Sequence, residues 1–302
     1  MTDYPDSLLF INGTWQQGSE KQTLPVTNPA SDQQIGCASI ATTRDLDAAA
    51  EAADKAFPVW RDTSAFERSR ILRAAAALIR ERIETNARIM TLEQGKPLRE
   101  ARAELNTAAD VFDWCAEEAR RTYGQVVPAR APGVLQITLK VPVGPTAAFT
   151  PWNFPVNQAA RKLGAGLAAG CTVVLKAAEE TPASAMELVR CLHDAGLPSG
   201  VVNLVFGVPA EISGHLIPHP AIRKISFTGS TAVGKQLAAM AGLHMKRATM
   251  ELGGHAPVIV AADADISQAV QLMIQHKFRN AGQVCVSPSR FLIQDSVAGA
   301  FL

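Results

Sequence analysis

The sequence has no excess of one charge, and this excludes the simplest electrostatic route to nucleic acids or membranes. Its 302 residues include 29 Lys and Arg against 28 Asp and Glu, a formal net charge of +1. A nearly neutral surface has no single-sign field that would draw the chain to DNA, RNA or anionic lipid. We therefore expect no nucleic-acid partner and no membrane partner.

Long hydrophobic runs and paired cysteines are also missing. Residues 1–10 lack the basic segment and apolar core of a signal peptide, and the richest apolar stretch, residues 257–262, has only the length of a strand. The cysteines are odd in number and scattered, with no Cys-x-x-Cys pair, at Cys37, Cys115, Cys171, Cys191 and Cys285. This pattern argues against a disulfide framework and a metal site, and it favours a reducing, cytoplasmic setting.

Local signals divide the chain into a helical first part and an alternating second part. Up to about residue 43 the chain is rich in turn signals, so we expect it to be irregular. Capping-box spacing then starts two helices, Thr42 with Asp45 and Ser64 with Glu67, and a third helix is expected over residues 99–121. Residues 125–143 alternate apolar and polar side chains around Pro132-Gly133, which predicts a hairpin that projects from the body.

From residue 146 strands and helices alternate, with short loops between them. Strands are expected at 146–150, 172–176, 201–206 and 224–227, and helices at 157–169, 182–195, 210–217 and 232–240. This alternation predicts an α/β fold with a doubly wound parallel sheet covered by helices on both faces, a Rossmann-like arrangement. The 47% hydrophobic content can fill one large or two ordinary domains.

Polar or glycine-rich clusters follow the predicted strands, where ligands bind in such sheets. They are residues 151–155, 176–179, 228–230 and 251–254. Gly229-Ser230 opens a helix and could seat an anion on free backbone amides, although an ordinary turn with a capping serine explains it equally well. The usual Gly-x-Gly-x-x-Gly dinucleotide fingerprint is absent, so each cluster alone is a weak signal.

Two reactive side chains stand out from the rest of the sequence. Cys285 lies in a glycine-containing segment, a more open setting than those of Cys171 and Cys191, yet a lone cysteine is more often a small buried hydrophobe than a nucleophile. Glu251 lies between Met250 and Leu252, where apolar neighbours would raise its pKa toward that of a general base. A glutamate turned to solvent at the end of a strand is the alternative.

Taken together, the motifs Pro-Trp-Asn-Phe-Pro, Phe-Thr-Gly-Ser, Glu-Leu-Gly-Gly and Gly-Gln-x-Cys resemble the aldehyde dehydrogenase superfamily in order and separation. The resemblance covers essentially the whole chain. It implies that Cys285 attacks an aldehyde as thiolate, and that the Asn153 amide and the Cys285 backbone amide hold the oxyanion. It further implies that Glu251 activates the water that hydrolyses the thioester.

The same resemblance implies a nicotinamide cofactor. Lys176 and Glu179 match positions that hold the adenosine ribose, Gly229 and Ser230 match the pyrophosphate site, and Trp152 lines the cofactor cleft. A carboxylate at position 179 should accept hydrogen bonds from a free 2′-hydroxyl and repel a 2′-phosphate. We therefore expect NAD rather than NADP.

For the substrate, Arg161 and Arg279 resemble the two arginines of the succinate-semialdehyde dehydrogenase branch, which grip the distal carboxylate of a small aldehyde. A guanidinium binds carboxylate bidentately, which suits this task. Structural ion pairs are the alternative role for one or both arginines. Other carboxylated or aromatic aldehydes remain open as substrates.

The resemblance also suggests boundaries. We expect residues 1–123 to be the helical part of the NAD-binding domain, 124–143 an oligomerisation hairpin, 144–251 the NAD-binding domain, and 252–302 an incomplete catalytic domain. Family chains continue well past this length and form homo-oligomers, so the sequence predicts a fragment. Three hypotheses follow: an active dehydrogenase, a catalytically silent NAD-binding fragment, and an unstable remnant whose Ile259, Ile266, Met273 and Phe291 lose packing partners.

Overall fold

The computed structural model describes residues 4–302, and the segment before the first helix is more ordered than the sequence indicates. It holds the antiparallel pairs β1 (Leu9–Ile11) with β2 (Thr14–Gln16) and β3 (Thr23–Thr27) with β4 (Gln34–Ser39). The expectation of an irregular segment was therefore wrong. Asn12 and Gly13 have φ values of 50° and 81°, and two successive left-handed residues make the tight connection that a β-hairpin prefers.

Four helices follow, and their starts agree with the capping signals. They are α1 (Thr43–Asp62), α2 (Ala65–Glu81), α3 (Ile83–Gln94) and α4 (Leu98–Ala119). The Thr42 hydroxyl and the Asp45 carboxylate each accept the other's backbone N–H, and the Ser64 hydroxyl accepts the N–H of Glu67. Gly95, with φ of 86°, ends α3 in the left-handed region where glycine costs least.

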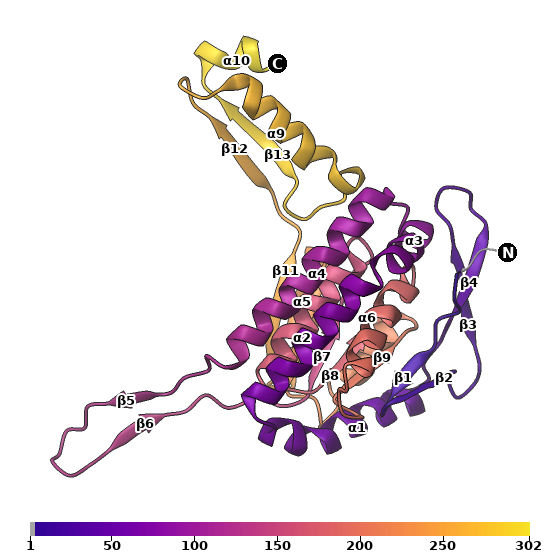
Figure 1. The fold of residues 1–302 in the computed structure, drawn as a ribbon, viewed down its shortest axis with the longest axis vertical. Coiled ribbons are helices and arrows are strands. Elements are labelled where there is room, and N and C mark those ends of the chain that lie inside the picture. The colour runs from indigo at the N-terminus through magenta and orange to yellow at the C-terminus, as the bar shows by residue number, and fades with distance from the viewer. Residues whose placement is uncertain (1–3) are drawn as a thin grey trace.

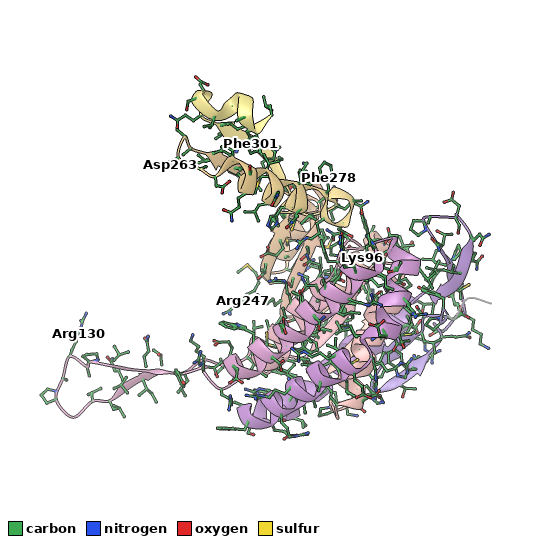
Figure 2. The ribbon with its side chains drawn as sticks, turned by 45° about the horizontal axis from the view of Figure 1, so that its top comes forward. Lys96, Arg130, Arg247, Asp263, Phe278 and Phe301 are labelled. Atoms are coloured by element: carbon green, nitrogen blue, oxygen red, sulfur yellow. The ribbon has the colours of Figure 1, made fainter. Side chains whose placement is uncertain are left out.

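The predicted hairpin is present and extends away from the body. Strands β5 (Gln125–Val127) and β6 (Gln136–Thr138) pair antiparallel, and Figure 1 shows them reaching outward as an isolated arm. Every residue of both strands is exposed. Figure 2 places Arg130 near the far end of this arm, well away from the helices.

Within residues 4–302 the main sheet has seven strands in the order β11-β10-β7-β8-β9-β1-β2. Its parallel part consists of β7 (Thr146–Phe149), β8 (Val173–Lys176), β9 (Val202–Val205), β10 (Lys224–Gly229) and β11 (Arg247–Leu252). The predicted parallel sheet is thus present, but β1 joins β9 in the antiparallel sense, so the N-terminal hairpin completes one edge.

Helices cover both faces of this sheet, as the alternation predicted. The connecting helices are α5 (Pro155–Ala168), α6 (Pro182–Asp194), α7 (Pro209–Leu216) and α8 (Thr231–Leu243). Helices α5 and α6 pack against each other, α2 packs on both of them, and α4 packs on α5. Helix α1 contacts α7, β8 and β9. One continuous core joins these layers, with Trp60, Phe112 and Phe206 among its fully buried side chains.

The last segment forms a small separate layer, seen in yellow in Figure 1. It comprises β12 (Ala256–Val260), α9 (Ile266–Phe278), a 3-10 turn (Arg279–Gly282), β13 (Pro288–Ile293) and α10 (Asp295–Phe301), with β12 and β13 parallel. Several of its large apolar side chains face solvent, among them Ile259 at 78% exposure and Phe278 at 68%. Across residues 4–302, no helix combines the length and the apolar character needed to cross a bilayer.

Candidate active site

The carboxyl ends of β10, β7 and β8 meet at one edge of the sheet. Phe149 pairs with Phe227 on one side and with Lys176 on the other, so the loops after these strands begin at the same level. The chain leaves β7 through α5 toward β8, whereas β10 lies on the opposite side of β7. This reversal of strand order is where α/β sheets open a ligand crevice.

A cleft of about 1380 Å³ lies beside this edge and collects most of the predicted site residues. It is lined by Trp152, Asn153, Arg161, Gly229, Glu251, Arg279 and Cys285, among others. These residues come from the β7–α5 loop, α5, β10, β11 and the turn after α9. The fold therefore gathers residues that are far apart in the sequence, as in the hydrogen bond between Asn153 and Gln283, which are 130 residues apart.

Cys285 is the exposed cysteine of the chain, and its setting differs from those of the other four. Cys115, Cys171 and Cys191 are buried and Cys37 is half-buried. Burial raises the pKa of the Cys115 thiol and raises that of Cys191 to about 12. Because the thiolate is the nucleophile, these two buried thiols are poor candidates for chemistry. An exposed thiol in a cleft is the better one.

The turn before Cys285 has an unusual backbone. Asn280, Ala281 and Gly282 have φ values of 52°, 54° and 76°, so three successive residues lie in the left-handed region. For Ala281 this conformation costs about 1 kcal/mol or more, and it persists only where surrounding contacts impose it. Asn280 supplies those contacts, since it is buried and its backbone N–H donates to the Glu100 carboxylate at 2.7 Å.

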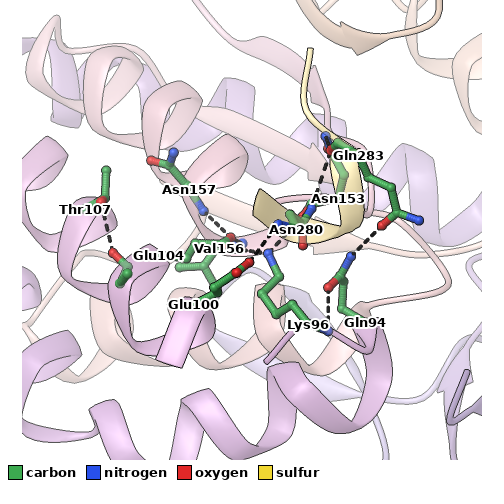
Figure 3. A network of polar contacts seen from close by, with 11 residues as sticks. Gln94, Lys96, Glu100, Glu104, Thr107, Asn153, Val156, Asn157, Asn280 and Gln283 are labelled. Atoms are coloured by element: carbon green, nitrogen blue, oxygen red, sulfur yellow. Dashed lines mark hydrogen bonds and ion pairs between the residues drawn. The ribbon is translucent and has the colours of Figure 1, made fainter. Parts of the chain in front are cut away.

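Asn153 is bonded directly to this turn. Its side-chain Nδ2 donates to the backbone carbonyl oxygen of Gln283 at 2.9 Å. The backbone carbonyl oxygen of Asn153 accepts from Asn280 Nδ2, also at 2.9 Å. Figure 3 shows these bonds joining the loop after β7 to the segment that carries the cysteine. A side-chain amide has two N–H groups, so one of them remains for a ligand in the cleft.

Glu251 and a lysine that sequence reasoning missed lie along the same cleft. Glu251 is exposed on β11, and Lys162 of α5 donates to Ser226 Oγ at 2.9 Å. Burial lowers the pKa of Lys162 to about 8, and the negative charge of Glu251 opposes this shift. Nothing in the sequence marks Lys162, because its burial and its bond to Ser226 arise only when α5 packs over β10.

A second missed pair, Lys96 and Glu104, lies beneath the Asn153 loop. Both side chains are 1% exposed and form an ion pair. Burial lowers the pKa of Lys96 and raises that of Glu104, while each partner's charge acts in the opposite direction. The only hint in the sequence is a lysine placed between Gly95 and Pro97, at a helix end where charged residues are common.

The predicted cofactor residues occupy the neighbouring part of the sheet edge. Lys176 is buried at the end of β8 and forms an ion pair with the half-buried Glu179. Ser230 is the N-cap of α8 and its hydroxyl accepts from Val233 N–H at 3.4 Å. Trp152 and Gly229 line the cleft with Cys285, whereas Lys176, Glu179 and Ser230 lie outside it.

These residues fit a dinucleotide. The first turn of α8 is exposed, from Thr231 to Val233, so its backbone amides and helix dipole can receive a phosphate. The Lys176–Glu179 pair offers one cation and one carboxylate for hydroxyl groups at the end of β8, two strands away from β10 in the sheet. The donor set therefore suits a phosphate group flanked by a ribose.

The two predicted substrate arginines both face the cleft. Arg161 is exposed on α5, and the Arg279 guanidinium lies 5.5 Å from the centroid of the Phe154 ring. Over the residues that the structure describes, neither arginine forms an ion pair with Asp or Glu. The alternative role as structural ion pairs therefore receives no support, and both cations are available to an anion.

Comparison with known proteins identifies the relatives of this arrangement. The model of the aldehyde dehydrogenase family matches residues 15–302. The chain is 52% identical to 4-(hydroxymethyl)benzenesulfonate dehydrogenase TsaD1 of Comamonas testosteroni, covering 97% of this chain and 62% of that protein. It is 44% identical to succinate-semialdehyde dehydrogenase [NADP(+)] GabD of Escherichia coli, covering 98% and 62%.

Solved structures agree with these matches. An aldehyde dehydrogenase from Brucella melitensis biovar abortus 2308 superimposes with a TM-score of 0.97 at 42% identity, covering 100% of this chain and 63% of that chain. The chain spans about 55–62% of the length of the curated relatives it matches.

Proposed function

The chain belongs to the aldehyde dehydrogenase family, and from this premise we propose that it oxidises an aldehyde to a carboxylic acid with NAD. The observation that carries the proposal is the bond from Asn153 Nδ2 to the Gln283 carbonyl, which holds an amide donor beside the cleft that Cys285 faces. Nucleophile and oxyanion donor need this proximity, since the oxyanion forms on the carbon that the thiolate attacks.

The proposed reaction uses residues of this chain at each position. The Cys285 thiolate adds to the aldehyde carbon, and the free N–H of Asn153 Nδ2 together with the Cys285 backbone N–H stabilises the oxyanion of the resulting thiohemiacetal. NAD, when bound, supplies the acceptor for the hydride that leaves this carbon. Glu251 then takes a proton from water, which attacks the remaining thioester and releases the acid and the thiol.

The direct test is aldehyde-dependent reduction of NAD by the purified 302-residue chain, followed at 340 nm, with Cys285→Ala as the matched variant. Turnover by the wild-type chain that the variant lacks supports the proposal. Equal rates in both would remove Cys285 from the mechanism.

For the cofactor we propose NAD over NADP, on the charge of Glu179. A carboxylate accepts from a ribose 2′-hydroxyl and repels a 2′-phosphate, and Glu179 is half-exposed at the end of the β8 loop. The Glu179→Ala variant should lose affinity for NAD and lose its discrimination against NADP. Fluorescence titration of the tryptophans with each cofactor measures both, and tighter binding of NADP to the wild-type chain would overturn the assignment.

For the substrate we propose a small aldehyde with a distal anion, held by Arg161 and Arg279. Relatives are named for succinate semialdehyde, for glutarate semialdehyde and for 4-(hydroxymethyl)benzenesulfonate, and each of these compounds carries a carboxylate or sulfonate group. Arg279→Ala should lower kcat/KM for succinate semialdehyde by about 10-fold or more, the value of one charge-assisted contact, and leave butanal unchanged. An unaltered preference would refute the carboxylate clamp.

A second candidate is an NAD-binding fragment without turnover. The exposed apolar side chains of Ile259, Phe278 and Leu292 favour it, because such surface is usually covered by further chain or by a partner. Cofactor binding without aldehyde oxidation would support this reading over the first.

We also propose that the β5–β6 arm joins copies of this chain. It presents Leu135, Ile137 and Leu139 to solvent, and an isolated two-stranded hairpin is rarely stable without a partner. Light scattering of the chain with and without residues 125–141 tests this, and an unchanged mass would refute it.

A further inference from the structure

Three loops converge on two carbonyl oxygens beneath the candidate active site. The Asn153 carbonyl accepts from Lys96 Nζ and from Asn280 Nδ2, each at 2.9 Å. The Gln283 carbonyl accepts from Asn153 Nδ2 at 2.9 Å and from Asn280 Nδ2 at 3.4 Å. Lys96 follows α3, Asn153 follows β7 and Asn280 follows α9, so these bonds join three separate parts of the chain (Figure 3).

Glu104 connects this cluster to the start of α5. Its Oε1 accepts from the backbone N–H groups of Val156 and Asn157 at 3.0 and 3.1 Å. The residue at the N-cap position, Phe154, makes no side-chain capping bond. A carboxylate from α4 therefore caps α5, and the ion pair with Lys96 lies directly under the Asn153–Phe154 peptide.

The Lys96–Glu104 ion pair itself adds little to the free energy of unfolding. Both charges are 1% exposed, and removing two ions from water costs several kcal/mol each, which their attraction only offsets. Apolar side chains of similar volume would avoid this desolvation cost, but they could not accept from the Val156 and Asn157 N–H groups. Lys96 instead provides what they cannot, a cation that donates to Glu104 and to the Asn153 carbonyl while its Nζ lies 4.3 Å from the Phe154 ring centroid.

We propose that Lys96 and Glu104 are positioning residues for the active site: they fix the Asn153 peptide, and through Asn280 they hold the left-handed turn that presents Cys285. The inference rests on the proposed function for Asn153 and Cys285. Neither Lys96 nor Glu104 touches the reacting atoms. Without the cation, the Asn153 carbonyl keeps only the Asn280 amide, so the peptide that anchors the left-handed turn of residues 280–282 is held by one bond instead of two.

The decisive variant is the double substitution Lys96→Met with Glu104→Leu. It replaces the ion pair with apolar groups, so neither charge is left buried and unpaired. The loss of the acceptor for the Val156 and Asn157 N–H groups should cost about 1 kcal/mol or more, and the chain should stay folded. Hydrogen exchange of the peptide spanning residues 279–286 should nevertheless become at least 10-fold faster. The α2 peptide around Ile71–Ile79 should remain as protected as before, because its core residues lie outside the cluster.

Turnover provides a second readout. Displacing an oxyanion donor acts on the transition state, so kcat for aldehyde oxidation should fall about 10- to 100-fold with KM little changed. Arg102→Met, which breaks the exposed Arg102–Glu84 pair between α3 and α4, is the matched control and should leave exchange and kcat unchanged.

A double variant with wild-type exchange at residues 279–286 would overturn the proposal, since the pair would then serve packing alone. If the wild-type chain shows no turnover, the proposed function fails, while the exchange measurement still decides the positioning role. Should the double variant not fold, Glu104→Gln keeps an oxygen for the α5 amides. Faster exchange confined to residues 279–286 would support the proposal in that variant, and unchanged exchange would overturn it.

Discussion

Glu93 is a fully buried carboxyl group, and its titration should govern how the stability of the protein depends on pH. It accepts from the backbone N–H groups of Ala183 and Ser184 at the start of α6, and from the hydroxyl of Tyr4. Burial raises the pKa of Glu93 from 4.5 to about 7, although these hydrogen bonds oppose the rise. Replacing it with Gln removes the ionisation and keeps the shape.

The direction and size of this pH effect follow from the linkage between proton binding and unfolding. Between pH 4.5 and about 7 the folded protein retains a proton that the unfolded chain releases, so stability falls as pH rises through this window. At about 1.4 kcal/mol per pH unit, the loss amounts to about 3 kcal/mol by pH 7. Above that pH the carboxyl is ionised in both states and the contribution stays constant.

Urea unfolding at pH 5, 6, 7 and 8, followed by tryptophan fluorescence, measures this loss. The free energy of unfolding of wild type minus that of Glu93→Gln should fall by about 2.5 kcal/mol across the series, because pH 5 already lies inside the window. Glu84→Gln is the control: a hydrogen bond from Arg102 lowers the pKa of this exposed carboxyl, so its titration lies below the window. Parallel curves for wild type and Glu93→Gln would refute the reasoning.

Two further outcomes are expected. Thr42→Ala removes the reciprocal cap of α1, in which Asp45 N–H donates to the Thr42 hydroxyl at 3.4 Å, and should cost about 1 kcal/mol of unfolding free energy by urea titration; an unchanged midpoint would mean that the cap contributes nothing. Iodoacetamide at pH 8 should label the exposed Cys285 well before Cys191, whose pKa burial raises to about 12, and mass spectrometry of tryptic peptides gives the order.

Local signals in the sequence predict where the helices and strands of this fold lie better than they predict which strands pair with one another. Thr42 and Ser64 start helices as expected because a cap acts within one turn, and the strand–helix alternation after residue 146 dictates parallel pairing. The pairing of β1 with β9 escaped prediction because three-residue strands such as Leu9–Ile11 carry too little periodicity. A sheet edge can recruit a short strand from anywhere in the chain.

The same limit applies to the site. Asn153, Glu251 and Cys285 were predicted because each lies in a motif that resembles a family. Glu104 and Lys162 lie in ordinary helical sequence, and Lys96 lies in the short connection between α3 and α4. Their significance arises from burial and from partners such as Ser226 and the Asn153 carbonyl, which only the folded chain brings within reach. Asn280 lies just before the Gly-Gln-x-Cys motif, and its left-handed backbone is a property of the tertiary contacts around it.

The antiparallel edge strand β1 also has a consequence for how the chain folds during synthesis. Its hairpin leaves the ribosome early, yet its partner β9 is made much later: Asn12 N–H donates to Asn203 Oδ1, a separation of 191 residues. At about 5–20 residues per second the apolar strand Leu9–Ile11 waits on the order of ten seconds or more without its neighbour. Such long-range closure is slow and leaves an open strand edge, so chaperone binding to this hairpin should end once β9 has emerged and paired with β1.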